Sequence, residues 1–92
     1  MSKNNIKDIE NIVKKSVDII NSNRIGKKKI DKNFDSDLSE IDSLGLVMLT
    51  MNIDEKIFEK YGKDIKLNKF FSKKKISLNS IVLYIDEQIK KN

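Results

Sequence analysis

The chain has 92 residues, contains neither cysteine nor histidine, and carries a formal net charge of +5. A domain of this length buries only about two-thirds of the surface that its unfolded chain exposes, so residues 1–92 are expected to form one small domain without a deep cleft. The missing residue types exclude disulfides, thiolate metal sites and a histidine general base. We therefore expect no enzymatic activity and no resident metal.

The charge is distributed unevenly along the chain. Residues 31–64 carry nine acidic and four basic side chains, whereas residues 1–30 carry eight basic and three acidic ones, and residues 65–92 carry seven and two. An acidic middle thus lies between two basic flanks. No apolar run approaches the roughly 18 residues of a membrane span, and no secretory signal is apparent, so a cytoplasmic location is expected.

The first predicted element is a helix over residues 6–20. Apolar side chains recur there at spacings of three and four, which is typical of a helix with one buried face: Ile6, Ile9, Val13, Val17 and Ile20. Residues 21–41 have no helical period. We expect an ordered loop there, because scattered apolar side chains can attach it to the helices: Ile25, Ile30, Phe34, Leu38 and Ile41.

A second helix is predicted from Asp42 or Ser43 to about Tyr61. Asp42 suits the N-cap, where its carboxylate could accept hydrogen bonds from the first turn, and Gly62 suits the C-terminal end. This helix is apolar on two faces. One face suits a core, with Leu46, Leu49, Ile53 and Ile57, and the other consists of Leu44, Val47, Met48 and Met51.

The remaining elements complete an all-α prediction. Ile65, Leu67, Phe70 and Phe71 suggest a short helix or an irregular turn. Ser77 is the expected N-cap of a last helix, whose apolar stripe is regular: Leu78, Ile81, Val82, Ile85 and Ile89. The fold class is therefore a small four-helix bundle, with three main helices, one short helix and a long ordered first loop.

Two stretches resemble the acyl carrier protein family. Residues 30–44 contain a Phe, an Asp-Leu pair and then Asp42-Ser43-Leu44 at the start of the second main helix, and residues 76–85 match the family's last helix, which begins at a hydroxyl cap and ends in a Tyr-Ile pair. The similarity extends over nearly the whole chain in order and spacing. On local grounds alone, Ser43 would instead be interpreted as part of a helix cap.

The resemblance implies a carrier function. A phosphopantetheinyl transferase, using Mg²⁺, would attach 4′-phosphopantetheine from coenzyme A to the Ser43 hydroxyl. The monomeric carrier would then present acyl or aminoacyl thioesters to loading and transferring enzymes. The implied docking residues are Asp37, Glu40, Asp42, Leu44, Val47, Met48 and Met51. Ile53, Ile57, Ile81 and Ile85 are candidates for the wall around a sequestered chain.

The chain also departs from the family pattern. Gly45 and Met48 occupy positions where acids are common on the second helix, and Lys56 adds a positive charge. These differences favour a specialised carrier over one of primary fatty-acid synthesis. The alternative is a small basic helical protein that binds nucleic acid or an acidic partner, through lysine runs around residues 27–29, 73–75 and 90–91. No basic stripe follows a helical face, so we expect no nucleic-acid partner.

Overall fold

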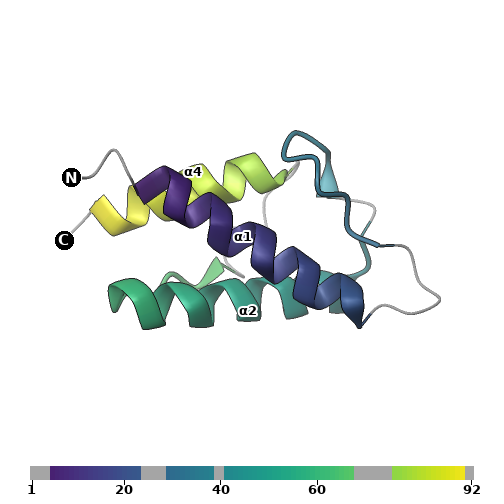
Figure 1. Cartoon of the computed structure of the whole chain (residues 1–92), viewed down its shortest axis with the longest axis horizontal. Coiled ribbons are helices and arrows are strands. Elements are labelled where there is room, and N and C mark those ends of the chain that lie inside the picture. The colour runs from purple at the N-terminus through teal and green to yellow at the C-terminus, as the bar shows by residue number, and fades with distance from the viewer. Residues whose placement is uncertain (1–4, 24–28, 39–40, 68–75, 91–92) are drawn as a thin grey trace.

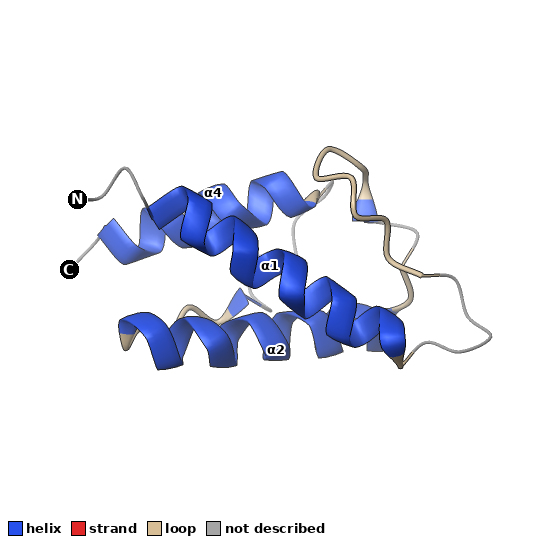
Figure 2. Ribbon diagram, in the orientation of Figure 1, coloured by secondary structure: helices blue, strands red, loops and turns tan. Residues whose placement is uncertain are grey.

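The structure is a computed structural model that describes residues 5–23, 29–38, 41–67 and 76–90, apart from the side chain of Ser43. These residues form three helices and no strand (Figures 1 and 2): α1 (Asn5–Ser22), α2 (Ser43–Tyr61) and α4 (Leu78–Lys90). The all-α prediction and its three main helices are confirmed. The short fourth helix is not confirmed. Of the four residues that suggested it, Ile65 and Leu67 are described and buried, while Phe70 and Phe71 lie outside the described residues.

Helix α1 is the central element of the bundle. It packs against both α2 and α4, and Figure 1 shows it running between them. The predicted apolar stripe faces the core, since Ile9, Val13, Val17 and Ile20 are each at most 3% exposed. Helix α1 therefore holds the other two helices together through a single face.

The core is completed by α2, α4 and the first loop. Its members outside α1 include Leu49, Ile53 and Ile57 from α2, four residues of α4 and two of the loop: Leu78, Ile81, Val82, Ile85, Ile30 and Leu38. Each such side chain contributes about 1.5–3 kcal/mol when fully buried. The four isoleucines considered as wall residues are all fully buried in this cluster. The radius of gyration is 12.5 Å, close to the ~12 Å of a compact domain of this length.

The helix ends follow the predicted capping residues. Gly62 ends α2 in the left-handed conformation (φ 69°), and its N–H donates to the carbonyl of Phe58 at 2.8 Å. At the start of α4, the Ser80 N–H donates to Ser77 Oγ at 3.2 Å, and the Ser77 N–H donates to Ser80 Oγ at 2.9 Å. This reciprocal pair is a capping box in which serine replaces the usual Glu or Gln.

Candidate functional site

The Asp42-Ser43-Leu44 tripeptide lies where the first loop enters α2. Asp42 has the extended backbone of an N-cap residue (φ −65°, ψ 159°), and its carbonyl accepts the N–H of Leu46 at 3.1 Å. Ser43 is therefore the first residue of the helix, as predicted. One expectation was wrong: the Asp42 carboxylate makes no capping hydrogen bond. The first-turn N–H groups of α2 are thus not capped by that side chain.

The loop that leads to Ser43 is attached to the body of the protein at several backbone positions. The N–H of Leu38 donates to the carbonyl of Ile76 at 2.8 Å, and the N–H of Asn79 donates to the carbonyl of Phe34 at 2.9 Å. Ile30, Leu38 and Ile41 are buried, and Phe34 packs against the core. The prediction of a packed loop is confirmed for these residues, while Ile25 lies outside the described part of the chain.

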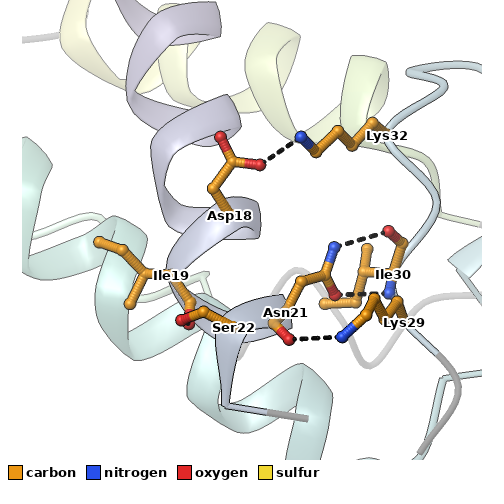
Figure 3. A network of polar contacts seen from close by, with 7 residues as sticks. All are labelled: Asp18, Ile19, Asn21, Ser22, Lys29, Ile30 and Lys32. Atoms are coloured by element: carbon orange, nitrogen blue, oxygen red, sulfur yellow. Dashed lines mark hydrogen bonds and ion pairs between the residues drawn. The ribbon is translucent and has the colours of Figure 1, made fainter. Parts of the chain in front are cut away.

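Asn21 fixes the beginning of this loop, which the sequence reasoning missed. Its side-chain amide donates to the carbonyl of Ile30 at 3.0 Å and accepts the N–H of Ile30 at 2.7 Å (Figure 3). Lys29 Nζ donates to the backbone carbonyl of Asn21 at 3.0 Å, and Lys32 pairs with Asp18 on the surface. The sequence pattern placed Asn21 at the beginning of the loop, but it lies within α1, is 9% exposed, and its side chain replaces backbone pairing for Ile30.

The acidic part of the approach loop is shaped by its own side chains. Asp31 Oδ1 accepts the N–H of Asn33, Asn33 Oδ1 accepts the N–H of Asp35, each at 2.9 Å, and Ser36 Oγ donates to Asp31 Oδ2 at 2.9 Å. These are turns in which a side chain bonds the backbone two residues further on. Asp37 is exposed, like Asp42. Glu40, the remaining acid of the predicted docking set, lies outside the described residues.

The second apolar face of α2 is exposed. Leu44, Val47, Met48 and Met51 have 59%, 49%, 36% and 64% of their surface exposed, whereas Leu49, Ile53 and Ile57 on the other side have none. Leu46, expected in the core face, is only partly buried against the core. The four apolar members of the predicted docking set thus form one apolar surface that begins next to Ser43.

A groove extends this surface toward α1. It is lined by residues from the C-terminal end of α1, by Asn23 directly after that helix and by the middle of α2: Ile19, Ile20, Asn23, Met48, Met51, Asn52, Asp54 and Glu55. Ile19, at 40%, and Phe58, at 59%, are also exposed apolar side chains, and the sequence reasoning named neither as a surface residue. For Phe58 the signal was available, because it lies seven residues after Met51 and so on the same side of the helix.

Asp54 is a partly buried carboxylate that lines this groove. Burial raises the pKa of Asp54, the hydrogen bond from the N–H of Leu67 opposes that shift, and the nearby Asp64 adds to it. The Leu67 N–H lies 3.3 Å and 3.2 Å from the two carboxylate oxygens. This contact ties the segment after α2 back to the helix, so the role supported for Asp54 is structural.

Of the lysine runs that suggested nucleic-acid binding, only Lys29 and Lys90 lie among the described residues. Lys29 is bonded to the end of α1, and Lys90 pairs with Asp86 at 3.0 Å. The runs around residues 27–28 and 73–75 and Lys91 lie outside the described residues. In the part of the chain that the structure describes, no group of three or more acidic side chains is arranged to hold a metal ion, and no helix is long and apolar enough to cross a membrane.

Comparison with known proteins gives the chain no relatives: no protein-family model, curated protein or solved structure matches it.

Proposed function

We propose that this chain is a carrier protein that holds acyl or aminoacyl groups as thioesters on a 4′-phosphopantetheine arm attached to Ser43. The observation that carries the proposal is the position of Asp42-Ser43-Leu44. Ser43 is the first residue of a 19-residue helix, it follows a loop packed onto the core, and exposed apolar side chains begin at the next residue. The order of these features is that of the acyl carrier proteins which the sequence resembles.

The beginning of α2 suits a phosphodiester on Ser43. The N-terminal end of a helix carries the positive end of its dipole together with N–H groups that lack carbonyl partners within the helix. A phosphate there gains about 0.3–1 kcal/mol from the dipole when it is exposed.

The attachment would be made by a separate phosphopantetheinyl transferase with Mg²⁺. The Ser43 oxygen forms a bond to the phosphorus that bears the pantetheine, the pyrophosphate bond of coenzyme A breaks, and adenosine 3′,5′-bisphosphate leaves. The serine proton passes to a base on the transferase. The arm supplies a terminal thiol, and so a nucleophile for thioester formation, that a chain without cysteine lacks. Tethering raises the local concentration of the cargo at each partner enzyme.

The chain's own residues would mainly provide recognition. Leu44, Val47, Met48 and Met51 offer an adaptable apolar surface beside the arm, since methionine side chains adjust to different partners at low cost. The acids Asp37 and Asp42 are exposed before it. With few acids on α2 itself, this surface fits a specialised carrier with its own set of partners better than a carrier of primary fatty-acid synthesis.

The test is the intact mass of the purified protein after incubation with coenzyme A, Mg²⁺ and a permissive phosphopantetheinyl transferase. We expect a gain of one phosphopantetheine unit in the wild type and none in Ser43→Ala. Ser77→Ala is the matched control, because Ser77 is also a serine at the start of a helix, directly before α4. This variant should still be modified. No gain in the wild type, or a gain that persists in Ser43→Ala, would contradict the proposal.

A further inference from the structure

The groove between α1 and α2 has an apolar part and a polar part. Its volume is about 570 Å³, within the roughly 300–1,000 Å³ of small-molecule sites. The apolar part is formed by two residues of α1 and two of α2: Ile19, Ile20, Met48 and Met51. The polar part is formed by two amides and two acids: Asn23, Asn52, Asp54 and Glu55. Such a lining suits a ligand that combines an apolar group with a polar one.

The polar part of the groove offers hydrogen-bond acceptors and negative charge. Asp54 and Glu55 contribute carboxylates, and no basic side chain is among the described lining residues. Asn52 Oδ1 is buried and has no hydrogen-bond partner among the described residues. The amide nitrogen of Asn23 already donates to the carbonyl of Ile19 at 3.2 Å. A ligand that brings N–H donors and a positive charge would therefore complete this part of the groove.

This chemistry distinguishes three classes of cargo. An acyl group that ends in a carboxylate would place a negative charge beside Asp54 and Glu55, which repel it. A neutral acyl group fits the apolar lining but brings no donor for Asn52 Oδ1. An aminoacyl group with an apolar side chain satisfies both parts of the groove, because its α-ammonium carries a positive charge and three N–H donors.

The groove lies within reach of an arm on Ser43. Met48 and Asn52 are five and nine residues after Ser43 on the same helix, which places them about 7.5 Å and about 13.5 Å further along its axis. The arm has roughly 14 bonds between the serine oxygen and its sulfur, as many as about five residues of chain, and so reaches about 16 Å when extended. An acyl group on that sulfur can therefore enter the groove without any movement of the helices.

We propose that the α1–α2 groove holds the cargo of the carrier and that this cargo is an aminoacyl group with an apolar side chain. The side chain lies on the apolar lining, and the α-ammonium faces Glu55 and Asn52. This inference rests on the proposed function and deepens it, because it selects aminoacyl over acyl cargo. Leu44 and Val47 are not among the lining residues, so they stay available to partner enzymes while the groove is occupied.

The test compares arms that differ only in the group at their end. A permissive phosphopantetheinyl transferase loads Ser43 from coenzyme A analogues in which an amide replaces the thioester and the end group is leucyl, 4-methylpentanoyl or succinyl. Intact mass verifies loading, and N–H chemical shifts are compared with those of the chain that carries the bare arm. We expect the leucyl arm to shift the N–H resonances of Ile19, Asn52 and Glu55.

The other two arms provide the controls for this measurement. The 4-methylpentanoyl group has the carbon skeleton of leucyl without its ammonium, and it should shift these resonances by less than half as much. The succinyl group carries a carboxylate and should leave them unchanged. Equal shifts from leucyl and 4-methylpentanoyl, or leucyl shifts confined to residues outside the groove, would overturn the proposal.

Variants locate the ammonium. Glu55→Lys should lower the fraction of leucyl arm bound in the groove by about tenfold. Glu59→Lys should leave it unchanged, because Glu59 is also an exposed acid of α2 but does not line the groove. Asn52→Leu keeps a side chain of similar size without the acceptor and should reduce the preference for leucyl over 4-methylpentanoyl. Equal effects of the two lysine variants, or an unchanged preference in Asn52→Leu, would contradict the proposed placement.

An untethered probe separates this proposal from the carrier function. Leucinamide, titrated at millimolar concentrations into the unmodified chain, should shift the same N–H resonances more than 4-methylpentanamide does. Selective binding of leucinamide by a chain whose Ser43 cannot be loaded would contradict the carrier function alone. A chain that is loaded on Ser43, but whose groove responds to neither leucyl arm nor leucinamide, would remain a carrier and contradict this inference alone.

Discussion

The two sides of α2 are made of similar residues and have opposite surroundings. On the inner side, Leu49, Ile53 and Ile57 have no exposed surface and form part of the core with α1 and α4. On the outer side, Leu44 and Met51 are 59% and 64% exposed. Hydrophobicity alone therefore does not separate the residues that fold this domain from those available for binding. What separates them is the position of α1, which covers only one side of α2.

Substitutions on the two sides provide the strongest test of this difference. Ile53→Ala removes methylene groups from a fully buried site and should lower the free energy of unfolding by about 2–5 kcal/mol. Met51→Ala lies at a site that is 64% exposed and should change stability by no more than about 0.5 kcal/mol. Urea unfolding followed by circular dichroism measures both. A large loss for Met51→Ala would show that the outer side also supports the fold.

The loop before Ser43 should depend on Asn21 more than on its neighbour Asn23. Asn21→Ala removes both hydrogen bonds to Ile30 and leaves buried backbone groups unpaired, at a cost of about 1–3 kcal/mol. Asn23→Ala removes only an exposed bond to the carbonyl of Ile19 and should cost less. Urea unfolding gives the two values, and hydrogen exchange should show that the Ile30 N–H is faster only in Asn21→Ala. Equal effects would contradict the anchoring role.

Loss of the N-terminal cap of α4 should lower stability less than Asn21→Ala does. Ser77→Ala removes the acceptor for the Ser80 N–H and should lower stability by about 1 kcal/mol. Helix α4 packs in the same core as the inner side of α2. A loss of stability of only about 1 kcal/mol in Ser77→Ala would therefore show that this core is retained when the start of α4 is weakened. Thermal unfolding of Ser77→Ala against Ser22→Ala, whose hydroxyl makes one exposed bond, measures the difference. A smaller loss for Ser77→Ala than for Ser22→Ala would contradict the capping box.

The smallest expected effect is the change of stability with pH that Asp54 causes. Asp54 lies between the inner and outer sides of α2. Burial raises the pKa of Asp54 above 3.8, so its protonated form is favoured in the folded state. Its contribution to stability is therefore fully present below pH 3.8 and is lost as the pH rises through the folded pKa. Asp54→Asn keeps an acceptor for the Leu67 N–H and removes this titration.

The measurement for Asp54 is urea unfolding of both proteins at a series of pH values. The stability of the wild type relative to Asp54→Asn should decline as the pH rises above 3.8 and then level off. A difference that is flat, or that increases with pH, would mean that burial does not dominate the environment of this carboxylate.

Periodicity was sufficient to predict the three main helices, because their core residues recur at helical spacing and their ends carry recognisable caps such as Ser77 and Gly62. It also showed that α2 is apolar on two faces, and one small core cannot cover both sides of a helix. The hydrogen bonds of Asn21 to Ile30 could not be predicted this way, because they depend on how the loop returns to α1. The absence of a cap hydrogen bond from Asp42 could not be predicted either, because Asp is an ordinary N-cap residue.

The candidate site was predictable in position but not in extent. Ser43 was located at the helix start from the tripeptide and its neighbours, and α2 begins there. The contribution of Ile19 to the outer surface depends on the packing of α1 against α2, which no local pattern contains. The exposure of Phe58 was predictable, because the spacing from Met51 continues through Glu55 to Phe58 on the same side of the helix.

The most direct test of the central claim is the mass of this protein as its own cells make it. The native chain should be purified, weighed intact and then digested, with the modified peptide fragmented to locate the added group. We expect a fraction that carries one 4′-phosphopantetheine on Ser43, with or without an acyl or aminoacyl group on its thiol. An unmodified chain under all growth conditions in which it is expressed, or an arm on any other serine, would contradict it.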